Sequence, residues 1–102
     1  MHLYGAWRIP LKVMFYTYIL HLSNNSLYVG STDDLKRRYK EHVWGKVEST
    51  RKRRPLKLIF YEAFLYKKDA QRREEYFKTS KGKRMLRVML KEYFNSNFSG
   101  IV

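Results

Sequence analysis

The chain has 102 residues, the size of one ordinary domain with a modest core, and 44% of them are apolar and 17% aromatic. Disordered chains lack such aromatic content, so the composition excludes an unfolded chain although 30% of the residues are charged. The 22 Lys and Arg against 9 Asp and Glu give a formal net charge of +13, which predicts a polyanionic partner: DNA first, with RNA as the alternative.

Other classes of protein are disfavoured by what the sequence lacks. No run approaches the roughly 18 apolar residues of a transmembrane helix, and the N-terminus has no secretory signal pattern. The absence of Cys excludes a disulfide-linked partner and a thiolate metal site. We therefore expect a cytoplasmic protein without a membrane partner, and the oligomeric state stays open.

The predicted elements begin after an irregular stretch, residues 1–13, which we interpret as an N-terminal extension. Residues 15–22 are β-branched and aromatic, with apolar side chains on both faces, which predicts a central strand covered by helices on both sides. A Ser- and Asn-rich turn leads to a second strand, residues 27–31, then a turn at Gly30 and a helix over residues 33–44 that is opened by Thr32 or Asp33 and stopped by Gly45.

A basic loop is expected between this helix and the third strand at residues 58–65. Six Lys and Arg residues in this loop predict sequence-independent contacts with phosphates, and the loop shows no pattern that would read bases. Its candidate nucleic-acid-binding residues are Lys46, Arg51, Lys52, Arg53, Arg54 and Lys57.

Two helices complete the predicted domain of residues 14–94, and residues 95–102 are interpreted as a tail. The first covers residues 68–79. Gly82 is expected to interrupt the helical pattern before the second, residues 83–94. The apolar stripe of this last helix is expected in the core, with dimerisation as a lesser alternative, and contains Met85, Leu86, Met89, Leu90, Tyr93 and Phe94.

The tripeptide Tyr28-Val29-Gly30 follows Tyr18 by ten residues and precedes Arg38 by a similar distance. With these residues the chain resembles the GIY-YIG nucleases over residues 15–80: the tripeptide is similar to the second signature of that family, and Tyr18 resembles the tyrosine of the first. Arg38 matches the arginine of the family's helix, His42 lies where many members have a histidine, and Glu74 resembles the carboxylate that binds one divalent metal ion.

The sequence also departs from the family pattern at three places. Tyr16-Thr17 stands where the first signature has Gly-Ile, and Ser31 follows the second signature where some members have a lysine. Others use an asparagine in the last helix, and none occurs between Glu74 and Glu92 here.

The resemblance implies that five side chains, distant along the chain, form a catalytic site. Arg38 would stabilise the phosphate, Glu74 would hold Mg²⁺ or Mn²⁺, and Tyr18 or Tyr28, assisted by His42, would activate water. Two alternatives stay open: His42 could be a packing residue, and Glu75 or Glu62 could compete with Glu74, although only Glu74 shares a helical face with Ala70 and Phe77.

The geometry of this site depends on strand register. Side chains alternate between the faces of a strand, so Tyr18 and Tyr28 share a face only if an odd-length loop or a bulge lies between Leu22 and Leu27. We predict such a loop or bulge.

The sequence thus predicts an α/β (α+β) fold, a three-stranded and mainly antiparallel sheet flanked by helices. The predicted function is metal-dependent hydrolysis of DNA phosphodiesters of the repair or recombination type, directed by backbone or structure. The alternatives are a non-catalytic DNA- or RNA-binding module of the same fold and a structural RNA-associated protein.

Overall fold

The computed structural model describes residues 13–97. Its elements are β1 (Phe15–His21), β2 (Leu27–Thr32), α2 (Leu35–Val43), α3 (Glu48–Arg51), β3 (Lys57–Phe64), α4 (Lys67–Phe77), α5 (Ser80–Met89) and α6 (Lys91–Asn97). The expected N-terminal extension, apart from its last residue, and the expected tail beyond residue 97 lie outside the described residues. No helix within residues 13–97 combines the length and apolarity needed to cross a membrane.

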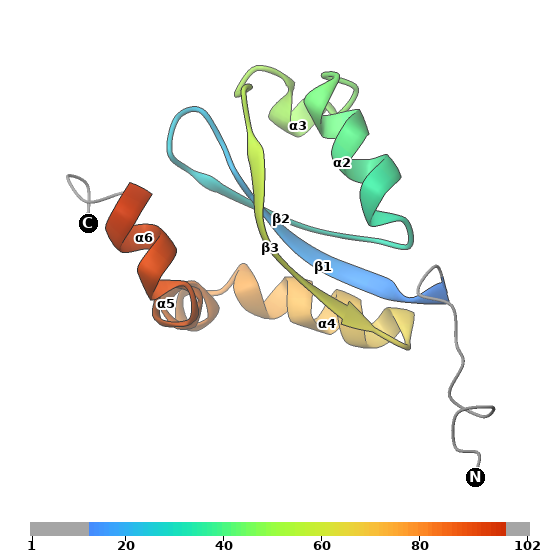
Figure 1. Ribbon diagram of the computed structural model, residues 1–102. Helices are drawn as coiled ribbons and strands as arrows, with labels where there is room; N and C mark the ends of the chain where they lie inside the picture. The colour runs from blue at the N-terminus through green and yellow to red at the C-terminus, as the bar shows by residue number, and fades with distance from the viewer. Residues whose placement is uncertain (1–12, 98–102) are drawn as a thin grey trace, which may run out of the picture.

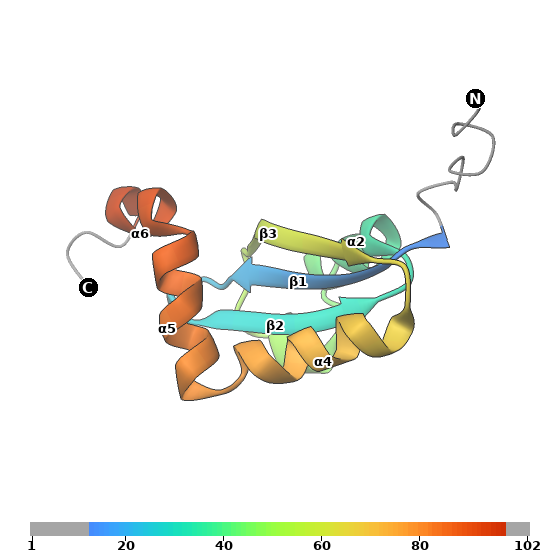
Figure 2. The same ribbon diagram turned by 90° about the horizontal axis from the view of Figure 1, so that it is seen from below.

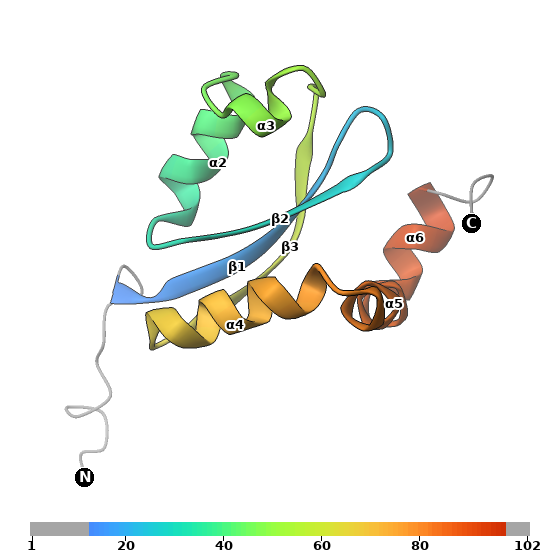
Figure 3. The ribbon, with the colours of Figure 1, turned by 180° about the vertical axis from the view of Figure 1, so that it is seen from behind.

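The strands form one antiparallel sheet in the order β2-β1-β3, with β1 in the centre. α2 and α3 cover one face of the sheet and α4 covers the other, while α5 and α6 lie at one end (Figures 1 and 3). Seen from below, α4 runs along the sheet on the side of the edge strand β2 (Figure 2). The predicted fold class and the helices on both faces are confirmed.

Alternate residues of β1 supply two separate parts of the core. Tyr18, Leu20 and Leu22 form a buried cluster against Leu35 and Tyr39 on the α2 side. On the opposite side, the α4 side, the next residue in the pleat, Ile19, packs with Phe77 and Leu86. Both faces of β1 are therefore buried, as the apolar residues on its two faces predicted.

The predicted relation between the two strand tyrosines is confirmed. Tyr18 pairs with Gly30 and Leu20 pairs with Tyr28, so the two tyrosines lie on the same face of the sheet. The connection that produces this register is residues 22–26, an odd number.

Gly30 lies inside β2 and not in a turn, which corrects the sequence interpretation. A Cβ atom at this position would come within 2.5 Å of the Tyr18 hydroxyl, because the phenol of Tyr18 lies across the glycine. Gly30 is thus needed for the close approach of a side chain from the neighbouring strand.

The region expected to be one basic loop contains the short helix α3. Val47 and Thr50 are buried and anchor this turn of helix, while the residues around them are exposed. A helix of four residues is too short to produce a periodic pattern, so the sequence predicted a loop.

Gly82 does not interrupt a helix; it lies in the first turn of α5, which begins at Ser80 after an N-cap at Thr79. A Cβ atom on Gly82 would lie 1.9 Å from the carbonyl oxygen of Tyr76. The glycine is required because the start of α5 crosses the end of α4 at close range.

The single helix expected over residues 83–94 is two helices, α5 and α6, which meet at Leu90. Leu86 and Phe94 are buried as expected. Met85 and Met89 are 41% and 39% exposed, so the predicted core stripe is wrong at these two positions. α5 and α6 each have a separate buried face. An apolar stripe predicted for one continuous helix therefore includes residues that are exposed on α5.

Candidate active site

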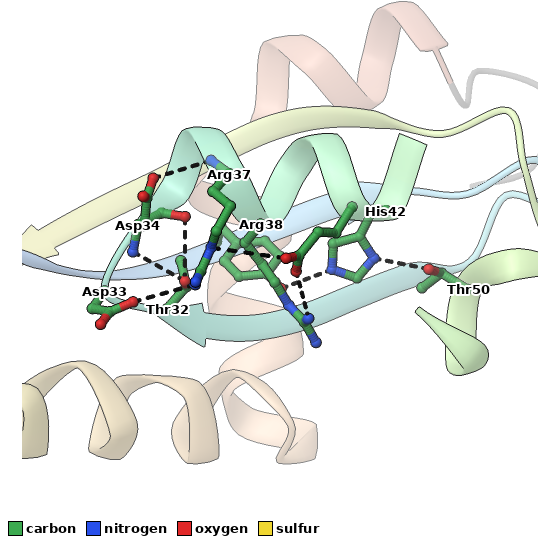
Figure 4. Close-up of polar contacts among 9 residues, drawn as sticks. Thr32, Asp33, Asp34, Arg37, Arg38, His42 and Thr50 are labelled. Carbon is green, nitrogen blue, oxygen red and sulfur yellow. Dashed lines mark hydrogen bonds and ion pairs between the residues drawn. The ribbon is translucent and has the colours of Figure 1, made fainter. Parts of the chain in front are cut away.

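A chain of hydrogen bonds is buried between the sheet and α2. The Tyr18 hydroxyl lies 2.8 Å from Nε2 of His42, and Nδ1 of His42 lies 2.8 Å from the Thr50 hydroxyl. All three residues have at most 1% of their surface exposed. Figure 4 shows His42 between the sheet and Thr50, which reaches it from α3. Tyr18 and His42 are thereby fixed in one arrangement.

Burial sets the protonation states in this chain. It raises the pKa of the Tyr18 phenol to about 12, although the nearby Arg38 guanidinium acts in the opposite direction. Burial and, to a smaller extent, the charge of Arg38 lower the pKa of His42 to about 4, although Glu41 acts in the opposite direction. At neutral pH, Tyr18 is a neutral phenol and His42 a neutral imidazole, with one ring nitrogen as donor and the other as acceptor.

Tyr28 completes an aromatic cluster on the same face. Its ring centroid lies 5.1 Å from that of His42 and 6.3 Å from that of Tyr18. Tyr28 is only half-buried because β2 is the edge strand. The two tyrosines therefore differ: Tyr18 is enclosed, whereas Tyr28 is accessible.

Arg38 is positioned by the N-terminal half of α2. The helix begins after Asp34, whose side chain accepts a hydrogen bond from the Arg37 amide at 3.0 Å. The cap is therefore Asp34, not Thr32 or Asp33 as expected; the hydroxyl of Thr32 instead accepts a bond from the Asp34 amide at 3.1 Å.

The Arg38 side chain extends from α2 across β2 (Figure 4). Its Nη1 donates a hydrogen bond to Oε1 of Glu41 at 2.9 Å, and about a third of the side chain is exposed. The guanidinium can therefore reach a phosphate at the edge of β2 while Glu41 orients it.

A groove opens beside Arg38, between α2, the end of β2 and α4. Three cations border it, and the residues that line it are Phe15, Ser31, Thr32, Asp33, Arg37, Arg38, Lys67, Ala70 and Gln71. It is the place where a nucleic-acid backbone could approach Arg38.

Glu74 reaches the same edge from the opposite face. It lies on α4, and its Oε1 accepts a hydrogen bond from the Ser31 hydroxyl of β2 at 2.7 Å. Its Oε2 accepts one from Nζ of Lys78 at 2.9 Å, and this bond raises the pKa of Lys78. The charge of Glu74 also contributes to the raised pKa of Tyr18, which places the carboxylate within electrostatic range of the tyrosine.

The competing carboxylates lie elsewhere. Glu75 is exposed, whereas Glu74, Ala70 and Phe77 face the sheet. Glu62 on β3 accepts a hydrogen bond from Arg73 at 2.7 Å and is thus engaged in a structural ion pair.

The donor set at Glu74 fits a divalent ion that keeps most of its water. Within residues 13–97 no three His, Cys, Asp or Glu side chains gather into a metal-binding group. Mg²⁺ is commonly held by one or two carboxylates together with water and phosphate oxygens, so Glu74 alone is sufficient. Lys78 would have to release Oε2 for such an ion to bind.

The six basic residues predicted to bind nucleic acid are all exposed. Arg54 also has a structural part, since its guanidinium donates to the carbonyls of Arg51 and Val43 and packs across Gly45. The Lys57 ammonium lies 5.3 Å from the ring centroid of Tyr93 on α6.

Sequence reasoning missed three contributors to this site: Thr50, Ser31 and Lys78. No pattern marks Thr50, which lies in a stretch expected to be a loop. Ser31 was noted only as a departure from the family signature. The spacing of four residues between Glu74 and Lys78 could have identified their ion pair, because residues four apart share a helix face.

Comparison with known proteins identifies the family of the chain. Residues 14–87 match the family model described as the GIY-YIG catalytic domain. The chain belongs to the GIY-YIG family. GIY-YIG domains are nuclease domains with nucleic-acid substrates and generally depend on a divalent metal ion.

The relatives of this GIY-YIG protein are small single-domain members. A UPF0213 protein of Streptococcus agalactiae serotype V is 46% identical over 69 residues, which is 67% of this chain and 78% of the relative. The UPF0213 protein YazA of Bacillus subtilis is 45% identical over 62 residues, which is 60% of this chain and 63% of the relative. The NMR structure of a UPF0213 protein from Bacillus halodurans has a TM-score of 0.52 and 35% identity and covers 82% of this chain and 94% of that one.

Proposed function

We propose that this GIY-YIG protein is an endonuclease that hydrolyses DNA phosphodiester bonds with Mg²⁺ or Mn²⁺, directed by backbone or structure as in repair or recombination. One observation carries the proposal: the Tyr18–His42 pair and Tyr28 lie on one face of the sheet beside Arg38, and Ser31 ties Glu74 to the same edge strand. A scissile phosphate at the edge of β2 would face all of these groups.

Each side chain has a part in the proposed reaction. The Arg38 guanidinium stabilises negative charge on the phosphate. Removal of one such donor typically lowers the rate of the chemical step about 10²–10³-fold. Glu74 holds the metal ion through its carboxylate. When bound, the ion supplies positive charge to the phosphate and makes its coordinated water more acidic.

The proton acceptor is assigned to Tyr28, acting as its phenolate, and not to Tyr18. With a pKa of about 12 and a hydroxyl bonded to His42, Tyr18 keeps its proton at neutral pH. Tyr28 lies at the accessible edge of the cluster, where it can meet a water molecule or the substrate. Neutral His42 assists by fixing the Tyr18 phenol, beside which the Tyr28 ring lies.

The test is Mg²⁺-dependent nicking of plasmid and branched DNA by the wild-type protein and by Glu74→Gln. We expect the wild type to nick and Glu74→Gln to lose at least about 10²-fold in rate, since the metal ligand is gone. Glu75→Gln is the matched control, because it removes an equal charge from an exposed neighbour and should keep full activity. Equal cleavage rates of Glu74→Gln and wild type would show that Glu74 does not hold the metal ion.

A second candidate, a non-catalytic nucleic-acid-binding module, is favoured by a separate observation. Both oxygens of Glu74 are engaged by Ser31 and Lys78, and Arg38 is paired with Glu41. In a binding module these ion pairs would persist when nucleic acid binds. A wild-type protein that binds DNA but never nicks it with Mg²⁺ or Mn²⁺ would establish this alternative.

A further inference from the structure

Trp44 is a large aromatic side chain that the proposed catalytic site does not use. It is the C-cap residue of α2, and 59% of its surface is exposed. Single exposed apolar residues are common on protein surfaces and alone indicate nothing. What distinguishes Trp44 is the chemistry of the groove around it.

The groove beside Trp44 is predominantly basic. It is lined by Asp34, Lys36, Arg37, Lys40, Glu41, Trp44 and Lys46. The Lys46 ammonium lies over the Trp44 ring, 5.4 Å from its centroid. An exposed aromatic ring next to several cations is the arrangement by which proteins bind single-stranded nucleic acid, with bases stacked on the ring and phosphates at the cations.

This groove adjoins the candidate active site. Arg37 lines both the groove beside Trp44 and the groove that contains Arg38. Trp44 follows Arg38 by six positions along α2 and its cap, which is about 9 Å along the helix axis and about a third of a turn around it. Nucleotides in a stacked strand are about 3.4 Å apart, so at least about three nucleotides would separate a base on Trp44 from a phosphate held by Arg38.

We propose that Trp44 stacks on an unpaired base of the substrate, so that this protein recognises nucleic acid with a single-stranded segment next to the phosphate at Arg38. A base inside a duplex is already stacked on both faces, whereas an unpaired base offers a free face to an aromatic side chain. Lys40 and Lys46 would neutralise the phosphates on either side. The inference rests on the proposed function only in that the substrate is nucleic acid.

The first test uses the fluorescence of Trp44 in the full chain. The sequence contains two tryptophans, Trp7 and Trp44, so Trp7→Phe leaves Trp44 as the only emitter. Binding is measured in EDTA, without cleavage, with an oligonucleotide in single-stranded form and as the duplex of the same sequence. We expect the single strand to quench the emission and the duplex to leave it unchanged. Equal quenching by both forms would overturn the inference.

The second test compares affinities. Loss of one base–aromatic stack costs about 5- to 150-fold in affinity, so Trp44→Ala should weaken binding of the single strand by that factor and leave duplex binding unchanged. Trp44→Phe keeps an aromatic face and should retain most of the affinity. Tyr66→Ala, which removes another exposed aromatic side chain, should have no effect.

Two outcomes contradict the role of Trp44. Equal binding of the single strand by wild type and Trp44→Ala would show that Trp44 does not stack on a base. A Trp44→Ala effect that appears only as a change in oligomeric state in sedimentation would show the same. The result is separable from catalysis because no metal is present. If Trp44→Ala loses single-strand affinity while the wild type never nicks DNA, the stacking inference holds and the nuclease proposal fails. If the wild type nicks DNA but Trp44→Ala binds the single strand normally, the nuclease proposal holds and the stacking inference fails.

Discussion

The two faces of the sheet are built from alternate residues of the same strands but bury different chemistry. On the α4 side, Ile19 packs with Phe77 and Leu86, all of them apolar. On the α2 side, the fully buried groups include Tyr18, His42 and Thr50, joined by hydrogen bonds of 2.8 Å. The α4 side contains one buried polar pair, in which the Thr17 hydroxyl donates to the Ala70 carbonyl at 2.7 Å. The α2 side contains a buried chain of three polar side chains beside the apolar Leu20 and Leu22.

The difference shows how a small domain can hold a reactive cluster in place. Apolar side chains stabilise by burial whatever their detailed orientation, whereas each buried polar atom needs a partner in a defined direction. Every buried side-chain nitrogen or oxygen within residues 13–97 has such a partner. Both sides therefore contribute apolar burial, and the polar chain of the α2 side also fixes the geometry at the edge of β2.

The largest expected effect is a loss of nicking rate, without a loss of stability, on substitution of Tyr28 on the α2 side. Tyr28→Phe removes the proposed proton acceptor and should lower the nicking rate by about 10²–10⁴-fold, the usual contribution of general base catalysis. The thermal midpoint should change little, because the ring and its packing remain. Tyr61→Phe, an exposed tyrosine of the same sheet, is the control and should cleave normally. Undiminished nicking by Tyr28→Phe would transfer the role to another group.

The opposite face should respond in stability. Phe77→Ala removes a fully buried ring between the sheet and α5 and should lower the free energy of unfolding by about 3–5 kcal/mol. Val88→Ala on α5, where the side chain is 69% exposed, should change it by less than about 0.5 kcal/mol. Urea titrations measure the free energy of unfolding of both variants. A Phe77→Ala variant of nearly wild-type stability would show that the α4 side does not carry the core.

The pH dependence of stability tests the burial of His42. The unfolded chain binds a proton at this residue below a pKa of about 6.5, but the folded chain only below about 4. Between these values the unfolded state holds more protons, so the free energy of unfolding should fall by about 3 kcal/mol as the pH drops from 6.5 to 4. Proton NMR of the imidazole provides the direct measurement. A folded-state titration centred near pH 6.5 would contradict the buried, neutral ring.

The smallest effect concerns the end of the hydrogen-bond chain. Thr50→Val keeps the shape of the side chain but leaves Nδ1 of His42 without its partner, which should cost about 1–3 kcal/mol of stability. Thr50→Ser restores the hydroxyl and should recover most of the loss. The nitrogen chemical shifts of His42 report the tautomer, which should be single in the wild type and mixed in Thr50→Val. An unchanged tautomer would mean that Thr50 does not position the ring.

Much of the site could be predicted because its signals are local. The strand tyrosines, the helix arginine and Glu74 were predicted from the resemblance to the GIY-YIG signatures, and helical spacing placed Glu74 on the face of Ala70 and Phe77. Even the odd length of the connection at residues 22–26 follows from the alternation of side chains along a strand. The roles of these residues stay predictions until cleavage is measured.

The errors arose where distant segments meet. Gly30 and Gly82 were interpreted as turn and break, but each is a glycine because another part of the chain approaches its backbone: the Tyr18 phenol in one case and the Tyr76 carbonyl in the other. Met85 and Met89 were placed in the core because one long helix was assumed where two short ones exist.

By itself the sequence determined the strands, the main helices and the charge, because these depend on composition and on short-range periodicity, and its signature residues indicated the family. Only the tertiary structure decided that Thr50 completes the chain from Tyr18 through His42, that Ser31 connects Glu74 to β2, and that Trp44 lies in a basic groove adjoining that of Arg38. The physical reason is that these relations join segments from different helices and strands, and their distances are set by how those elements pack.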